Sequence, residues 1–150
     1  MQTYQIQQHG LTISTDTSLL DFDWTHQSIR NSYWAKGIPR ETFDRSLEHS
    51  LCFGAYLSKI QVGFARVVTD YATFAYLGDV FIHEEHRGHG YSKTLIEAVM
   101  IHPDLQGLRR FCLGTKDAHS LYERFGFKVI KDFDNWMEIK IPDIYQKSGD

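Results

Sequence analysis

The segment spanning residues 74–115 constrains the fold of this chain more than any other feature. Phe74–Ile82 is a mostly apolar, β-rich stretch, and Tyr91–Ile101 carries apolar residues at helical spacing before Pro103. A second β-rich stretch follows at Arg110–Thr115. A strand, a helix and a strand in this order predict an α/β unit rather than an all-helical or all-β fold.

An antiparallel meander is expected ahead of this unit. Leu51–Leu57 and Val62–Val68 have the composition of strands and flank a polar turn at Ser58–Gln61, which predicts a hairpin. The strand at Phe74–Ile82 is then the third of the meander, and its apolar character predicts a central position in the sheet.

The N-terminal part predicts one short strand and two helices. The strand is expected at either Tyr4–Gln7 or Leu11–Ser14. The helices are expected at about Asp23–Tyr33 and Pro39–His49. Asp21 or Asp23 can cap the first helix, Gly37 separates the two, and Pro39 suits the first turn of the second.

The C-terminal part predicts a helix and two closing strands. The helix is expected at Asp117–Phe125, with Gly126 at its C-terminal cap. The strands are expected at Phe127–Ile130 and Asn135–Ile141, joined by a polar turn at Asp132–Asp134. The chain is therefore predicted to be a mixed α/β (α+β) fold.

Length and charge narrow the class of protein further. The 150 residues predict one domain, residues 1–150, and a net charge of −3 gives no basic surface for nucleic acid or an anionic membrane. The N-terminus lacks the pattern of a secretory signal, and no apolar run approaches 18 residues. Cys52 and Cys112 stand alone in strand-like runs, which is typical of reduced thiols. We therefore expect a cytoplasmic protein with no nucleic-acid or membrane partner.

A glycine-containing loop lies between the strand at Phe74–Ile82 and the helix at Tyr91–Ile101. Gly88 and Gly90 allow backbone N–H groups to converge there, and the positive end of the helix dipole favours a phosphate or pyrophosphate. The alternative is a tight turn that needs glycine only for its backbone angles. The loop has neither the Walker nor the Rossmann glycine pattern.

Several histidines and carboxylates crowd the same loop and raise the question of a metal: His83, Glu84, Glu85, His86 and His89. His83 and His86 are three residues apart and precede the helix, unlike the i, i+4 pair of a zinc-binding His-Glu-x-x-His helix. A solvated loop beside the phosphate site explains them better, and no metal is predicted.

Three motifs resemble those of the GNAT N-acetyltransferases. Arg87-Gly88-His89-Gly90-Tyr91-Ser92 resembles the family's acetyl-CoA pyrophosphate loop, and Asp79–Glu84 resembles its fourth strand. Ala118–Phe127 resembles the segment that carries the family's tyrosine. The resemblance implies a central mixed, mostly antiparallel sheet of six to seven strands flanked by about four helices.

The resemblance also implies a reaction, namely acetyl transfer from acetyl-CoA to a primary amine of a small molecule or peptide. Tyr122 would act as general acid toward the departing thiolate. The backbone of the fourth strand would pair with pantetheine, and the loop amides would hold the pyrophosphate. The residues implied in binding the cosubstrate are Val80, Phe81, Ile82, Arg87, Gly88, His89, Gly90, Tyr91, Ser92 and His119.

The sequence departs from the family pattern in two places. Ser92 stands where glycine or alanine is usual, and its hydroxyl could instead donate to a phosphate. The asparagine often found after the fifth strand is not evident; Lys116, Asp117 and His119 occupy that stretch.

Asp79 is a candidate general base because it lies on an otherwise apolar strand, where a carboxylate is costly unless it is paired or functional. The equal alternative is a paired, structural aspartate. Tyr33, Trp34 and Tyr76 are candidates for the acceptor site, and the alternative is that such aromatic residues belong to the core.

A second class of function remains open at this point, a non-catalytic acyl-CoA-binding sensor or interaction module on the same fold. A homodimer through the C-terminal strands would be compatible with the fold, although no apolar stripe in the sequence demonstrates one.

Overall fold

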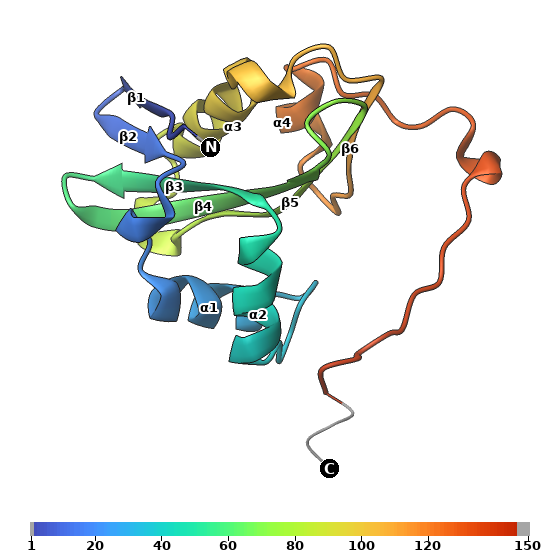
Figure 1. The fold of residues 1–150 in the computed structure, drawn as a ribbon, viewed down its shortest axis with the longest axis horizontal. Coiled ribbons are helices and arrows are strands. Elements are labelled where there is room, and N and C mark those ends of the chain that lie inside the picture. The colour runs from blue at the N-terminus through green and yellow to red at the C-terminus, as the bar shows by residue number, and fades with distance from the viewer. Residues whose placement is uncertain (1, 147–150) are drawn as a thin grey trace.

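The six strands that the structure describes lie in one sheet in the order of the sequence (Figure 1). The computed structural model describes residues 2–146. All neighbouring strands are antiparallel except β5 and β6, which are parallel. The strands are β1 Gln5–Gln8, β2 Leu11–Ser14, β3 Leu51–Leu57, β4 Ile60–Thr69, β5 Phe74–Ile82 and β6 Arg110–Leu113.

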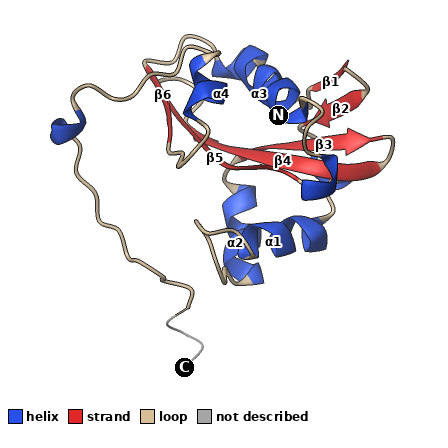
Figure 2. Ribbon diagram, turned by 180° about the vertical axis from the view of Figure 1, so that it is seen from behind, coloured by secondary structure: helices blue, strands red, loops and turns tan. Residues whose placement is uncertain are grey.

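Two pairs of helices cover the two faces of the sheet (Figures 1 and 2). The helices are α1 Phe22–Arg30, α2 Arg40–Glu48, α3 Tyr91–Ile101 and α4 His119–Glu123. The pair α1 and α2 encloses a small core around Phe43 and Phe64, while α3 and α4 cover a larger core that includes Leu95 and Tyr122. The predicted class, a mixed and mostly antiparallel sheet flanked by four helices, is confirmed.

The strand β5 separates from β6 half way along its length. The parallel pairing runs from Phe74 opposite Arg110 to Leu77 opposite Leu113 and stops there. Beyond Leu77, β5 continues with β4 as its neighbour on one side only. This leaves one backbone edge of the C-terminal half of β5 without a strand partner in the described structure.

A β-bulge begins where this separation begins. On β4 only Ala65 lies between two paired positions, whereas on β5 the corresponding interval holds Asp79 and Val80. Asp79 has a φ of +53°, a conformation that few residues other than glycine, asparagine and aspartate adopt readily. The extra residue bends the strand and turns its edge away from the regular ladder.

The N-terminal elements follow the sequence closely, with small differences. Both candidate strands form, and they pair as a hairpin. Asp21 caps α1 by accepting a hydrogen bond from the Trp24 amide at 3.0 Å. The helix ends at Arg30 rather than Tyr33, because the chain turns into a loop there.

The prediction of two strands at Phe127–Ile130 and Asn135–Ile141 is wrong. Neither segment forms a strand, and the chain after Ile130 leaves the body of the molecule (Figure 1). A strand requires backbone hydrogen bonds to a second strand, and within residues 2–146 neither segment pairs with a strand of the sheet. Similarly, β6 ends at Leu113 rather than Thr115, and α4 is shorter than the predicted Asp117–Phe125.

No helix within residues 2–146 is long and apolar enough to cross a bilayer.

The buried thiol of Cys52 is expected to be chemically inert. Burial raises its pKa from 9.0 to about 12, and the side chain is 2% exposed. The reactive thiolate is then about a thousandfold scarcer than in an unperturbed cysteine. Iodoacetamide at pH 8 should leave Cys52 unmodified in the native protein and alkylate it in urea. Rapid alkylation without denaturant would contradict this assignment.

Candidate active site

The loop between β5 and α3 forms a cradle of backbone amides. Gly88 and Gly90 have φ values of +86° and +78°, and a Cβ at either would meet no atom within 4 Å. Glycine is required here for the backbone angle, therefore, and not for space. Gly90 is the N-cap of α3, and the first backbone bond of that helix runs from Thr94 N to Gly90 O at 3.2 Å.

The amides of the first turn of α3 therefore have no acceptor within the helix. They belong to Tyr91, Ser92 and Lys93, all of which line a cavity of about 290 Å³. A helix of eleven residues adds the positive end of its dipole at the same place. An anionic group such as a pyrophosphate fits this arrangement.

The other wall of this cavity comes from α4 and its end. Ser120, Leu121 and Arg124 line it opposite the loop. Sequence reasoning missed Ser120 and Arg124. Because they are four residues apart and α4 covers His119–Glu123, they lie on one side of that helical turn, which is the signal that could have found them.

The residues predicted to bind the cosubstrate make different contacts in the structure. The Arg87 Nε donates to the Ile82 carbonyl at 3.0 Å, so this side chain ties the loop to the end of β5. The ring of His89 lies against that of Tyr91, with centroids 5.5 Å apart. His119, also predicted to contact the cosubstrate, lines a different cavity together with Tyr122.

His83 has a structural role at the start of the loop. His83 Nδ1 accepts a hydrogen bond from the Glu85 amide at 3.3 Å and thereby caps the 3-10 turn Glu84–His86. Within residues 2–146, no group of three or more His, Cys, Asp or Glu side chains is arranged to hold a metal ion.

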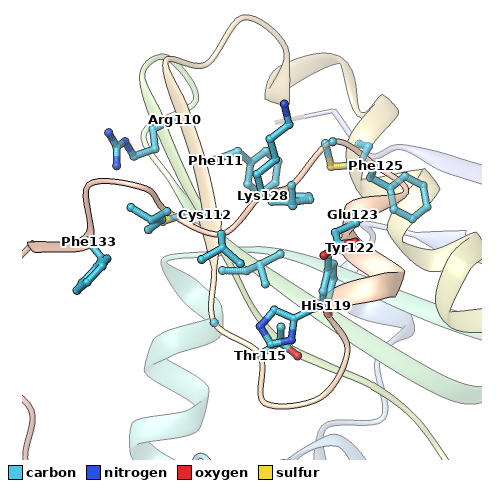
Figure 3. A pocket seen from close by; sticks show the side chains of 17 residues that line it. Arg110, Phe111, Cys112, Thr115, His119, Tyr122, Glu123, Phe125, Lys128 and Phe133 are labelled. Carbon is cyan, nitrogen blue, oxygen red and sulfur yellow. The ribbon is translucent and has the colours of Figure 1, made fainter.

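Tyr122 is a buried tyrosine at the edge of the second cavity, which has a volume of about 520 Å³ (Figure 3). In Figure 3 its ring lies next to His119, with Thr115 nearby. Its ring also packs edge-on against Phe127 at 6.0 Å. Burial, with a smaller contribution from Tyr33, raises the pKa of Tyr122 above its usual value of 10. The hydroxyl therefore keeps its proton at neutral pH.

Asp79 occupies the bulge of β5 as a paired carboxylate. One oxygen accepts from Arg66 Nε at 2.7 Å, and the other accepts from Trp34 Nε1 at 2.7 Å. The side chains of Arg66 and Asp79 are 19% and 10% exposed. Of the two interpretations of Asp79, this geometry favours the structural one. Trp34 and Arg66 were not foreseen as its partners.

The candidate acceptor residues lie around this aspartate. Trp34 bonds to Asp79, Tyr33 packs edge-on against Trp34 at 5.1 Å, and the Lys116 Nζ lies 4.7 Å from the centre of the Tyr33 ring. Burial first, and then the charge of Asp79, raises the pKa of Tyr76. Tyr33, Trp34 and Tyr76 are all more than 40% exposed, so the structure places them outside the core.

In this protein a mixed sheet opens beside the cradle of backbone amides at the start of α3, and α4 carries a tyrosine with a protonated hydroxyl. This arrangement is the one expected of a GNAT acetyltransferase. Comparison with known proteins agrees. Residues 48–129 match the family described as Acetyltransferase (GNAT) domain.

Three similar proteins illustrate the relationship. “Putative acetyltransferase FG08082” of Gibberella zeae is 31% identical over 153 residues, covering 86% of this chain and 85% of that protein. A crystal structure from Xanthomonas campestris pv. campestris, of a protein described as belonging to the GNAT family, is 54% identical, with a TM-score of 0.88 over 90% of this chain and 96% of that one. A GNAT family acetyltransferase from Elizabethkingia anophelis with acetyl-CoA bound shares the fold at 16% identity, with a TM-score of 0.61 over 87% of this chain and 88% of that one.

This chain therefore belongs to the GNAT acetyltransferase family and is an acyltransferase. GNAT acetyltransferases use acetyl-CoA, and their reaction requires an amine acceptor.

Proposed function

We propose that this enzyme transfers the acetyl group of acetyl-CoA to a primary amine of a small molecule or peptide. One observation carries the proposal: the free amides at the start of α3 lie at the end of the open edge of β5. The cradle suits a pyrophosphate, and the edge of β5 at Val80–Ile82 that faces away from β4 suits an extended pantetheine arm. The residues of this chain thus fit both the pyrophosphate and the pantetheine arm of acetyl-CoA.

The reaction proceeds by direct attack, without an acyl-enzyme. Acetyl-CoA supplies the acetyl group: the amine nitrogen forms a bond to the acetyl carbon, the carbon–sulfur bond breaks, and CoA leaves as a thiolate. A backbone N–H of Val80–Ile82 polarises the carbonyl oxygen. Tyr122 donates its proton to the sulfur, a role that its raised pKa allows.

The amine must lose a proton before it attacks, and Asp79 is poorly placed to remove it. Both of its oxygens already accept hydrogen bonds, one of them from a guanidinium. We therefore assign Asp79 to holding the bulge and the Trp34 indole in position, and assign proton removal to water at the mouth of the site.

The acceptor is expected to be cationic or aromatic. The Lys116 ammonium lies over the face of Tyr33, a contact that supports the binding of a cationic acceptor at this ring. Trp34 and Tyr76 extend the same exposed aromatic surface. Against the alternative of a non-catalytic sensor, Tyr122 combines burial with access to a cavity, which cosubstrate binding alone does not require.

Thermal unfolding with acetyl-CoA tests the binding half of this proposal. A ligand at 100 times its Kd stabilises a folded protein by about 2.7 kcal/mol. For a chain of 150 residues, this corresponds to a rise of several degrees in Tm. An unchanged Tm at millimolar acetyl-CoA would overturn the proposal.

Replacing Gly90 by alanine is expected to weaken acetyl-CoA binding about 5- to 30-fold. A non-glycine residue at φ of +78° costs about 1–2 kcal/mol, and the first turn of α3 would relax away from its amide geometry. Calorimetric titration measures the change in Kd.

Gly10→Ala is the matched control, since Gly10 has a φ of +77° and nothing within 4 Å of its Cβ position, but lies in the β1–β2 turn. The control should keep the native Kd. Equal affinity in Gly90→Ala and the native protein would place the anion elsewhere.

A further inference from the structure

Lys116 ends a chain of contacts that crosses the opening between β5 and β6. Its ammonium lies 4.7 Å from the centre of the Tyr33 ring, and Tyr33 packs edge-on against Trp34 at 5.1 Å. Trp34 in turn donates to Asp79 on β5 at 2.7 Å. The contacts therefore run from the segment after β6, through the loop between α1 and α2, to the bulge of β5.

The register of the two strands places Lys116 across the opening from the edge proposed to hold the thioester. The last pair of β5 and β6 is Leu77 with Leu113, and Val80 and Lys116 each lie three residues beyond it. Because the two strands are parallel, both segments leave this pair in the same direction, one on each side of the opening. The acceptor amine of the proposed reaction has to enter the same opening.

The proposed general acid has the same neighbours as Lys116. Thr115, which precedes Lys116, lies near the Tyr122 ring in Figure 3. Tyr33, the ring under the Lys116 ammonium, is also close enough to Tyr122 to contribute to the raised pKa of that hydroxyl. Tyr33 is therefore a neighbour of both the Lys116 amine and the Tyr122 hydroxyl.

The Lys116 amine is available for reaction. None of the ion pairs within residues 2–146 involves it, so no carboxylate has to release the ammonium before it loses a proton. The contact with Tyr33 is a weak one, because both residues are exposed to water. Water can therefore remove the proton, and the product is a primary amine at the acceptor side of the site.

We propose that Lys116 is itself an acceptor of this enzyme and is acetylated within the same molecule. The inference rests on the proposed transfer from acetyl-CoA. The ammonium loses one proton to water, Nζ forms a bond to the acetyl carbon and loses a second proton, and the carbon–sulfur bond breaks. The thiolate takes a proton from Tyr122, which water replaces. The products are an uncharged side-chain amide and free CoA thiol.

The reaction is expected to stop at one acetyl group per chain. An amide nitrogen is no longer a nucleophile, so Lys116 cannot react again. Acetylation also removes the charge that holds the side chain over Tyr33. The modified side chain is therefore released from this ring.

Mass spectrometry of the full chain incubated with ¹³C-acetyl-CoA, without added amine, tests the proposal. We expect one labelled acetyl group per chain, assigned to Lys116 by peptide mapping. The initial rate at Lys116 should saturate with acetyl-CoA, because the reaction starts from a bound complex. Its rate constant should not depend on protein concentration, because the step is intramolecular.

Lys59 is the internal control for uncatalysed acetylation. It is exposed in the turn between β3 and β4 and lines neither cavity, so its labelling should be slow and rise in proportion to acetyl-CoA. The matched variants are Lys116→Arg, which should lose the saturable label, and Lys59→Arg, which should keep it. Labelling of Lys116 that is as slow as that of Lys59, or that does not saturate, would overturn the proposal. A rate constant that rises with protein concentration would also overturn it, since transfer would then occur between copies.

A parallel sample with added amines separates this inference from the proposed function. Label on an added amine, with Lys116 unlabelled in both samples, would overturn the inference and leave the proposed function standing. An unchanged Tm at millimolar acetyl-CoA, together with no label on Lys116 or on any amine, would overturn both.

Discussion

Replacing Tyr122 by phenylalanine is expected to lower kcat by about 10²–10⁴-fold, the usual contribution of a general acid. The substitution removes only the hydroxyl, and the ring keeps its packing against Phe127. Because the amide cradle of α3 is untouched, the Kd for acetyl-CoA should stay the same. Steady-state turnover and calorimetric binding, measured on the same preparation, check both statements.

Tyr56→Phe is the matched control for this prediction. Tyr56 is also buried, and its hydroxyl has no hydrogen-bond partner in the described structure. Removal of that hydroxyl deletes no hydrogen bond of the described structure, and Tyr56 lines neither of the two cavities, so kcat should not change. If Tyr122→Phe also kept its full kcat, Tyr122 would not be the acid, although acetyl transfer itself would stand.

The second large effect is expected at Asp79, where replacement by alanine should destabilise the protein by about 3–5 kcal/mol. The substitution leaves the Arg66 guanidinium, only 19% exposed, without its partner. It also places alanine, which avoids positive φ values, at a position where φ is +53°. Urea unfolding measures the loss as a lower midpoint.

Three variants identify the cause of that loss. Asp23→Ala breaks an ion pair to Arg40 whose aspartate is 90% exposed, and it should cost less than about 1 kcal/mol. Asp79→Asn retains an acceptor for Trp34 and a tolerance for positive φ, so it should cost less than alanine. Adding Arg66→Met to Asp79→Ala should restore part of the stability. A native midpoint in Asp79→Ala would show that the pair does not hold the bulge.

The sequence could predict the elements whose own pattern is strong. Phe74–Ile82 and Tyr91–Ile101 form with the predicted bounds, because a long apolar strand and a helix ended by proline each carry their signal locally. The positive φ of Gly88 and Gly90 was predictable for the same reason.

The sequence could not predict contacts between distant segments. The partners of Asp79 come from residues 13 and 45 positions away, and no local pattern announces them. The prediction of a strand at Asn135–Ile141 is wrong because its alternating apolar pattern is local, whereas a strand also needs a neighbouring strand, and the described structure provides none there. Whether the whole chain forms one domain stays a prediction, as do the roles of the individual site residues.

Transfer of a labelled acetyl group tests the central claim most directly. The protein is incubated with acetyl-CoA labelled in the acetyl group and a mixed pool of amines, polyamines, antibiotics and peptides, and the products are separated by mass spectrometry. We expect the label on one class of amine, free CoA thiol in equal amount, and a rate that falls about 10²–10⁴-fold in Tyr122→Phe. Saturable binding of acetyl-CoA with no label on any amine would contradict catalysis and support a sensor on the same fold.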